Sequence, residues 1–282
     1  MKITETIHAF KHHFRLALGE NHYVDRFVYS YILLGDQVCL IDTGVWGTAT
    51  LLQAYLSQTG RSPKEISAVV LTHAHPDHIG GSLAIQKASS AAFHAHTADK
   101  PWIEDVERQY RERPILNFFE LVEGSVFVNR ELKEGDTVSW TKGKTIRVLE
   151  TPGHSPGSIS FFYEEEGALF TGDAVPAVGT LPIYVDPQAS IESIRKLQKL
   201  SRVKHLLSSW HEPISGNQVH TTLEQGIRYI QTIDEIVTDL SKTMPPETPG
   251  EELSLRALER LGIKTTQVLY MVRTSFESHR KK

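Results

Sequence analysis

The stretch that decides the fold is THAHPDHIGG, residues 72–81, which follows directly on the apolar run ISAVVL of residues 66–71. A continuous run rich in β-branched residues is typical of a strand buried on both faces, so we expect a strand that ends where the histidines begin. His73 and His75 are two residues apart, and alternate side chains of an extended backbone project the same way. The two imidazoles are therefore able to share one metal ion.

The second half of the stretch changes direction. Pro76 enforces a turn, so Asp77 and His78 approach the same space from another angle and are placed to hold a second ion. The glycine pair Gly80-Gly81 then lets the backbone pack closely as a helix begins. Residues 73–78 thus supply four candidate metal ligands, a density that argues against ordinary structural histidines.

Three more candidates stand at the ends of later apolar strands. They are His154 in TPGHSPGS, Asp173 in FTGDA and His211 in SSWHEP. In a layered α/β fold, such strand ends line one edge, where binding sites gather. Histidine is also the side chain best suited to borderline-soft divalent metals at neutral pH.

Strand and helix signals alternate along the chain, which predicts the α/β class. Residues 28–42 read as two strands joined at Gly35-Asp36, and residues 47–59 as a helix closed by Gly60. Residues 97–122 read as a charged, mostly helical excursion. Further strands follow, with a helix at 190–200.

A composition break divides the chain near its C-terminus. Residues 244–250 read MPPETPG, and three prolines in so short a stretch cannot extend the preceding helix. We therefore expect a main domain over 1–243 and a C-terminal helical extension over 244–282, with two short helices in 251–275.

The bulk composition argues against two classes of partner, nucleic acids and membranes. A formal charge of -4 and a pI near 6.4 provide no broad positive surface for nucleic acid, and the 40% apolar content suggests no membrane class. The N-terminal segment lacks the apolar core of a signal peptide. Cys39 lies in the apolar run VCLID and reads as a buried hydrophobe. We expect a cytoplasmic enzyme with a small-molecule substrate. Its oligomeric state is left open, with a homodimer as one alternative.

The motif and its ordered satellites resemble the metallo-β-lactamase superfamily. The resemblance rests on THAHPDHIGG, on Asp42 before this motif, and on His154, Asp173 and His211 after it in that order. It covers roughly residues 20–215. It implies a four-layer αββα sandwich with the metals at one edge between two facing sheets.

The same resemblance implies a ligand set. It assigns His73, His75 and His154 to the first metal, Asp77, His78 and His211 to the second, and Asp173 to both. Asp42 would orient the site from behind the ligands. The expected cofactors are two divalent ions, zinc first, with Mn²⁺ or Fe²⁺ as alternatives.

Two ions roughly 3.5–4 Å apart can share a hydroxide, hold a carbonyl oxygen and neutralise its developing charge. We therefore expect a binuclear hydrolase of ester-like bonds, a thioester or a lactone, that attacks with a metal-bridging hydroxide. Asp77 is the candidate catalytic residue that orients this hydroxide. The resemblance is to the glyoxalase II and lactonase branch, although the stretch after Asp173 lacks the Gly-Cys-Gly-Arg type sequence of glutathione-thioester enzymes.

Other readings stay open. A mononuclear iron persulfide dioxygenase would share several of these ligand positions, and a phosphodiesterase would use the same two-metal centre. A metal-bearing sensor or partner-binding module is a non-catalytic alternative. Trp210, beside His211, departs from the glycine-flanked version of this motif.

Overall fold

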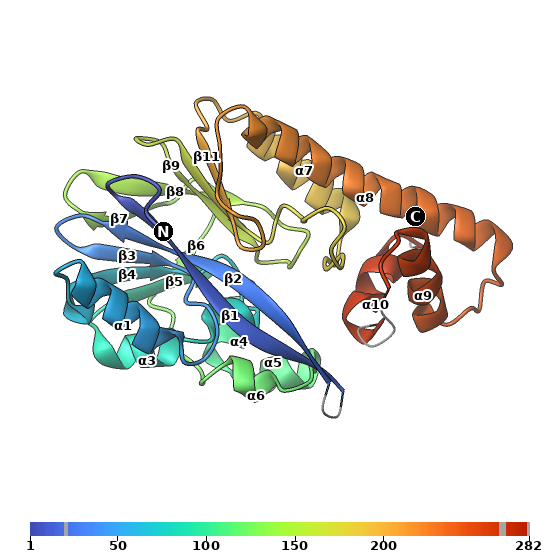
Figure 1. The fold of residues 1–282 in the computed structure, drawn as a ribbon, viewed down its shortest axis with the longest axis horizontal. Coiled ribbons are helices and arrows are strands. Elements are labelled where there is room, and N and C mark those ends of the chain that lie inside the picture. Colours follow the sequence, from blue (N-terminus) through green and yellow to red (C-terminus); the bar gives the residue numbers. More distant parts are fainter. Residues whose placement is uncertain (20–21, 265–268, 281–282) are drawn as a thin grey trace.

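The computed structural model describes residues 1–19, 22–264 and 269–280. Two six-stranded sheets face each other, and helices cover the outer face of each (Figure 1). The expected four-layer αββα sandwich with C-terminal helices is confirmed.

The first sheet has the order β1-β2-β3-β4-β5-β6. The bounds of its strands are β1 Ile7–Gly19, β2 His22–Leu34, β3 Val38–Ile41, β4 Ile66–Val70, β5 Ala92–His96 and β6 Arg130–Leu132. Strands β3 to β6 run parallel, so their carboxyl ends meet at one edge. The expected strand at 66–71 is β4, which is buried almost throughout and runs directly into the histidine motif.

The second sheet has the order β12-β11-β10-β9-β8-β7. Its strands are β7 Thr137–Thr141, β8 Lys144–Glu150, β9 Ile159–Tyr163, β10 Ala168–Gly172, β11 His205–Ser208 and β12 Ile214–Ser215. The loops after β8, β10 and β11 carry His154, Asp173 and His211. These strand ends face the motif across the sandwich.

Three apolar clusters hold the layers together. The central cluster lies between the sheets and includes Ile41, Val70, Phe161 and Phe170, all fully buried. A second cluster joins the first sheet to its outer helices, whose bounds are α1 Thr48–Gln58, α2 Pro76–Ile79, α3 Ser82–Ala88, α4 Lys100–Glu104, α5 Val106–Glu112 and α6 Phe118–Leu121. Burial of apolar area in these clusters is the main stabilising term of the fold.

The third cluster lies outside the second sheet. It includes residues of α7 Pro187–Gln198, α8 Gln218–Thr243, α9 Gly250–Arg260 and α10 Leu269–Ser278. Helix α8 ends at Thr243, and the proline-rich stretch turns the chain so that α9 and α10 return beneath α8 (Figure 1). The domain division at 243/244 stays a prediction, and part of the expected second helix, residues 265–268, lies outside the described residues.

The long β1–β2 hairpin is a feature that the sequence analysis did not assign before residue 28. Its strands pair antiparallel from Ile7↔Leu33 to Gly19↔His22. Buried His8 and His12 stand on the same strand face as Leu16, where a strand pattern would show apolar residues. These polar residues hide the period-two alternation in the sequence.

No helix of the described residues is long and apolar enough to cross a membrane.

Candidate metal centre and adjoining pocket

Four of the expected ligands converge at the edge between the sheets. His73 and His75 follow β4, His154 lies between β8 and β9, and Asp173 follows β10. One ligand atom from each of these side chains lies within 4.8 Å of the others. Among the described residues, this is the one group of that density that is fit to hold a metal ion.

Local backbone geometry explains how the motif presents its side chains. His75 is extended (φ −63°, ψ 148°) and directly precedes α2, which Pro76 opens at the first helical position. Proline is favoured there because its missing N–H would have no partner within the helix. The turn expected at Pro76 is thus a short helix, and it carries Asp77 and His78. A Cβ on Gly80 would lie 2.2 Å from the Leu121 carbonyl oxygen, so the close backbone approach expected there is confirmed.

The hydrogen bonds of His154 and His73 place the proton of each ring on Nδ1, away from the centre of the cluster. His154 Nδ1 lies 2.6 Å from the Ile183 carbonyl oxygen, so Nδ1 carries the proton and Nε2 has a free lone pair. His73 Nδ1 lies 3.1 Å from the Thr72 hydroxyl, which leaves His73 Nε2 unprotonated in the same way. Both Nε2 atoms approach His75 Nδ1, at 2.8 and 3.0 Å.

Three ring nitrogens therefore converge with at most one proton among them. Burial lowers the pKa of His73 and His75 well below the usual range, and it lowers the pKa of His154 to about 4. Neutral imidazoles with converging lone pairs are what a divalent cation requires. The residues present fit a metal ion.

A second set of candidates lies beside the first. His78 Nε2 is 3.2 Å from Asp173 Oδ1 and 3.7 Å from Asp77 Oδ2. Although burial opposes a charge on His78, the carboxylates of Asp173, Asp77 and Asp42 hold its pKa well above the usual value. This space favours a positive charge.

Three of the candidate ligand atoms have few partners among the described residues. His211 Nε2 makes no hydrogen bond, and at hydrogen-bond distance His78 Nε2 and Asp173 Oδ1 have only their 3.2 Å contact with each other. Buried polar atoms normally have partners, so these three atoms are suited to bind a metal ion. However, Asp77, His78 and His211 do not form a cluster as dense as that of the first set.

Asp42 orients two of the histidine rings. It follows β3 with a positive φ of 57°, and its side chain is buried. Oδ2 accepts hydrogen bonds from His78 Nδ1 at 2.8 Å and from the Thr72 hydroxyl at 2.7 Å, and that hydroxyl in turn accepts from His73. Asp42 thereby fixes which nitrogen of each ring is free to bind metal.

Asp99 is a supporting residue that the sequence analysis missed. Its buried carboxylate accepts a hydrogen bond of 2.7 Å from the Ala74 N–H, between the first two ligands. It also accepts from the Ser155 hydroxyl at 3.2 Å and from the Gly157 N–H, in the loop of His154. One side chain therefore joins the loop of His73 and His75 to the loop of His154. Asp99 stands alone after HAHTA, and nothing in its sequence context indicates these contacts.

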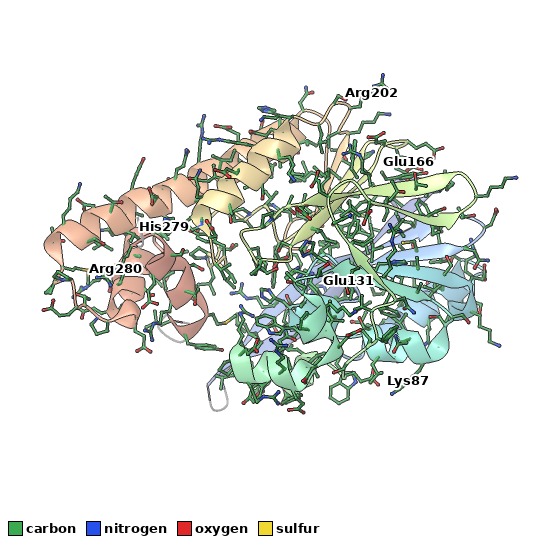
Figure 2. All side chains as sticks on the ribbon, turned by 180° about the vertical axis from the view of Figure 1, so that it is seen from behind. Lys87, Glu131, Glu166, Arg202, His279 and Arg280 are labelled. Carbon is green, nitrogen blue, oxygen red and sulfur yellow. The ribbon has the colours of Figure 1, made fainter. Side chains whose placement is uncertain are left out.

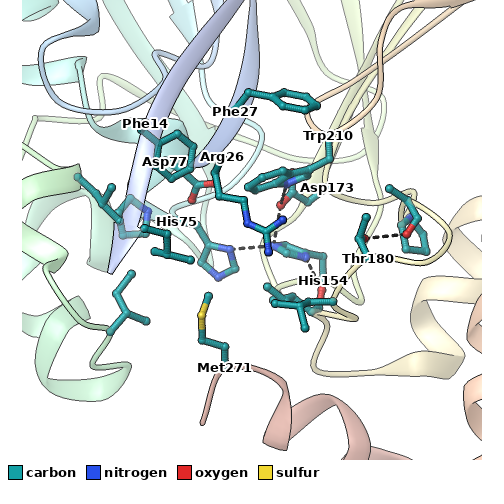
Figure 3. Close-up of a pocket in the computed structure, with 18 of the residues that line it drawn as sticks. Phe14, Arg26, Phe27, His75, Asp77, His154, Asp173, Thr180, Trp210 and Met271 are labelled. Atoms are coloured by element: carbon teal, nitrogen blue, oxygen red, sulfur yellow. Dashed lines mark hydrogen bonds and ion pairs between the residues drawn. The ribbon is translucent and has the colours of Figure 1, made fainter. Parts of the chain in front are cut away.

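Trp210 takes part in the site directly. Its indole Nε1 donates a 2.8 Å hydrogen bond to Asp173 Oδ2 (Figure 3). This contact helps to orient the Asp173 carboxylate, and the indole rings pack near Phe14 and Phe27. The departure noted beside His211 is thus a hydrogen-bond donor to a candidate bridging ligand.

A pocket opens above the metal candidates. Figure 3 shows His75, Asp77, His154 and Asp173 among its lining residues. Its walls are mainly apolar and come from distant segments: Phe14, Leu16, Phe27, Ile115, Leu121, Val175, Leu181, Ile183, Trp210 and Met271. Such a cavity suits a small molecule with an apolar portion.

The pocket wall is tied to the C-terminal helices. Ile183, which accepts from His154, precedes Tyr184, and the Ser275 hydroxyl of α10 bonds both the Tyr184 N–H and carbonyl, at 3.0 and 2.9 Å. The Tyr184 hydroxyl lies 2.8 Å from His279 Nε2, where α10 meets α8 (Figure 2). Tyr184 is a tether within the protein. It is absent from the lining of the apolar pocket, but it lines the neighbouring pocket that shares His75 and His154.

The histidine pair His94 and His96 has the same two-residue spacing as His73 and His75 but lies outside the cluster. His96 Nε2 lies 3.3 Å from a Glu150 carboxylate oxygen, and burial lowers the pKa of His94 to about 4. Two aromatic residues of the helical excursion have different places: Trp102 lines a neighbouring pocket, whereas Phe118 packs in the outer core.

Comparisons with known proteins agree with this geometry. Residues 23–207 match the model of the Metallo-beta-lactamase superfamily. A hydroxyacylglutathione hydrolase from Hyphomonas neptunium is 28% identical over 60% of this chain and 58% of its own length. An atrochrysone carboxyl ACP thioesterase from Aspergillus fumigatus is 32% identical over 61% of this chain and 47% of its own length. The chain spans about half the length of these curated relatives.

Solved structures share the fold. A metallo-beta-lactamase family protein from Thermus thermophilus superposes with a TM-score of 0.75 and 23% identity, over 99% of this chain and 94% of that one. A beta-lactamase domain protein from Burkholderia ambifaria gives 0.71 and 17% identity, over 99% and 86%. Both alignments span nearly the whole chain, so the C-terminal helices fall within the shared architecture.

Proposed function

Because this chain belongs to the metallo-β-lactamase superfamily, we propose that it is a metal-dependent hydrolase of small-molecule thioesters and related acyl esters. It would use two divalent ions, with zinc as the expected metal, and would act in the cytoplasm. Two relatives support the substrate class, because their names describe enzymes that cleave thioesters.

The observation that carries the proposal is a dense cluster that lines a largely apolar pocket. The ligand atoms of His73, His75, His154 and Asp173 lie within 4.8 Å of one another, and three of these four residues line the pocket. An acyl chain placed along the apolar walls would bring its carbonyl to the cluster. Divalent ions bound there would supply an acidified water and neutralise charge on the carbonyl oxygen.

The remaining steps belong to the chain's own residues. Asp77 lies beside His78 at the pocket end and is placed to accept a hydrogen bond from the attacking water, which would orient it. Trp210 and Asp42 hold Asp173 and His78 in position through their hydrogen bonds. A substrate seated against the apolar walls would displace water, and electrostatic interactions in the pocket would then be stronger than in solution.

The test combines metal analysis with a substrate panel. Purified protein is loaded separately with zinc, manganese and iron, its metal content is measured, and thioesters, lactones and phosphodiesters are assayed. We expect about two ions per chain and hydrolysis of thioesters. His75→Ala and Asp173→Ala should abolish activity.

His96→Ala is the matched control, because His96 has the same two-residue spacing as the motif pair but contacts Glu150. It should retain most activity. One iron per chain with oxygen uptake on a persulfide substrate would instead identify a dioxygenase, and loss of activity in His96→Ala alone would overturn the site assignment.

A further inference from the structure

Two arginines enter the pocket without a carboxylate partner. Arg26 extends from β2 into the cavity (Figure 3), and Arg113 approaches from the segment between α5 and α6. Neither guanidinium forms a hydrogen bond or an ion pair with the described residues, whereas their neighbours Arg108 and Arg15 pair with Glu112 and Asp25. An unpaired guanidinium in a partly closed pocket is costly, because its donors lose water without gaining acceptors.

The acidic groups nearby have other candidate partners. Asp77 and Asp173 line the same pocket, but they belong to the candidate metal set, and Asp25 is exposed beside Arg15. Bound metal ions would neutralise the negative charge of the two buried aspartates. Arg113 would then face a positively charged centre, and burial already lowers its pKa.

A negatively charged ligand group would resolve this imbalance. A guanidinium presents a planar set of donors that matches the two oxygens of a carboxylate or a phosphate. The apolar side chains that share this pocket with the arginines and the metal candidates, such as Phe14, Ile115 and Met271, suit a carbon chain rather than another charge.

We propose that Arg113, assisted by Arg26, forms an anion subsite that selects substrates carrying a carboxylate or a phosphate away from the bond that is cleaved. The inference rests on the proposed function for the identity of that bond. The anion has two sources: the far end of an acidic acyl chain, or a phosphate on the leaving thiol. Arg113 and Arg26 are thus specificity-determining residues that leave the hydrolytic step to the metal centre.

Two pairs of substrates distinguish the sources. The acyl pair is the glutaryl and pentanoyl thioesters of N-acetylcysteamine, which match in chain length and differ in a terminal carboxylate. The leaving-group pair is the pentanoyl thioesters of phosphopantetheine and of pantetheine. We expect the metal-loaded protein to favour the anionic member of one pair by about tenfold or more in kcat/KM.

Arg113→Met should remove this preference by lowering kcat/KM for the anionic member alone, and Arg113→Lys should restore part of it. Arg111→Met is the matched control, since Arg111 lies two residues away on the surface beside Asp105 and outside the pocket. It should leave both pairs unchanged. A thermal melt of each variant separates loss of the subsite from loss of the fold.

Binding gives a readout that does not depend on hydrolysis. The N-propyl amides of glutaric and pentanoic acid, and phosphopantetheine and pantetheine themselves, are titrated calorimetrically into the wild type and Arg113→Met, with and without metal. Weaker binding of an anionic member to Arg113→Met supports the subsite even if no thioester is cleaved, an outcome that would refute the proposed function alone. Equal effects of Arg113→Met on both members of both pairs would overturn the subsite, whatever the activity.

Discussion

Replacing Asp42 by asparagine tests whether this carboxylate orients the candidate metal ligands. The backbone at Asp42 has a positive φ of 57°, a conformation that asparagine tolerates better than most residues, so the substitution changes little except the side chain. In the wild type, Oδ1 accepts from the Thr72 N–H and Oδ2 accepts from His78 Nδ1 and the Thr72 hydroxyl. Either orientation of an amide puts its NH₂ group against one of these donors.

The size of the effect follows from the bonds that are lost. If the amide nitrogen takes the Oδ2 position, His78 loses a hydrogen bond to a charged acceptor, worth about 1.5–3 kcal/mol, while the Thr72 hydroxyl can rotate to compensate. His78 is also freed to adopt the other tautomer, which turns its proton toward the metal side. Loss of such an orienting partner typically lowers metal affinity about 10- to 100-fold.

Two measurements separate these contributions. Zinc affinity is obtained by competition with a chelator, and the free energy of unfolding of the metal-free protein by urea titration. Asp25→Asn is the control, because Asp25 is an exposed aspartate at the pocket rim. If Asp42→Asn bound zinc as tightly as Asp25→Asn and unfolded at the same urea concentration, the orienting role of Asp42 would be wrong.

Two further substitutions test residues outside the candidate ligand set. Asp99→Ala leaves the buried N–H groups of Ala74 and Gly157 without acceptors, so we expect the free energy of unfolding in urea to fall by about 2–5 kcal/mol and zinc to bind more weakly. A change no larger than that of Asp25→Ala would contradict the role of Asp99 in joining the two loops. Burial lowers the pKa of His12 to about 3, whereas an unfolded histidine titrates near 6.5, so the unfolded chain takes up a proton first as the pH falls. Stability contributed by neutral His12 is therefore lost below about pH 6.5, and His12→Gln should reduce the destabilisation of the metal-free protein between pH 7 and 5 by about 2 kcal/mol, as measured by urea unfolding at both pH values. Identical losses in the two proteins would show that His12 does not titrate in this way.

The sequence was a strong guide wherever a short-range pattern fixes geometry. The β-branched run before the motif predicts β4, and the two-residue spacing of His73 and His75 needs only extended backbone to bring their side chains to one place. The strand ends that carry His154 and Asp173 were located in the same way, because apolar runs and turn residues are local signals. The expected α/β class and four-layer arrangement are confirmed.

The sequence was a weaker guide where buried polar residues interrupt the pattern. His8 and His12 conceal the first strand, since an alternation of polar and apolar residues is readable only if the inward positions are apolar. Nor could the sequence show how the C-terminal helices pack against the site, where Met271 of α10 lines the pocket and Ser275 holds the segment that orients His154.

By itself, the sequence determined the candidate ligands, their order along the chain and the strand that presents the motif. Only the tertiary structure decided what surrounds them: Asp99 joining two ligand loops, Trp210 donating to Asp173, and Arg113 reaching the pocket with no partner. The physical reason is range. A ligand motif is encoded by neighbours within a few residues, whereas a hydrogen-bond acceptor, a pocket wall or an unpaired charge is defined by groups that meet only after the chain has folded.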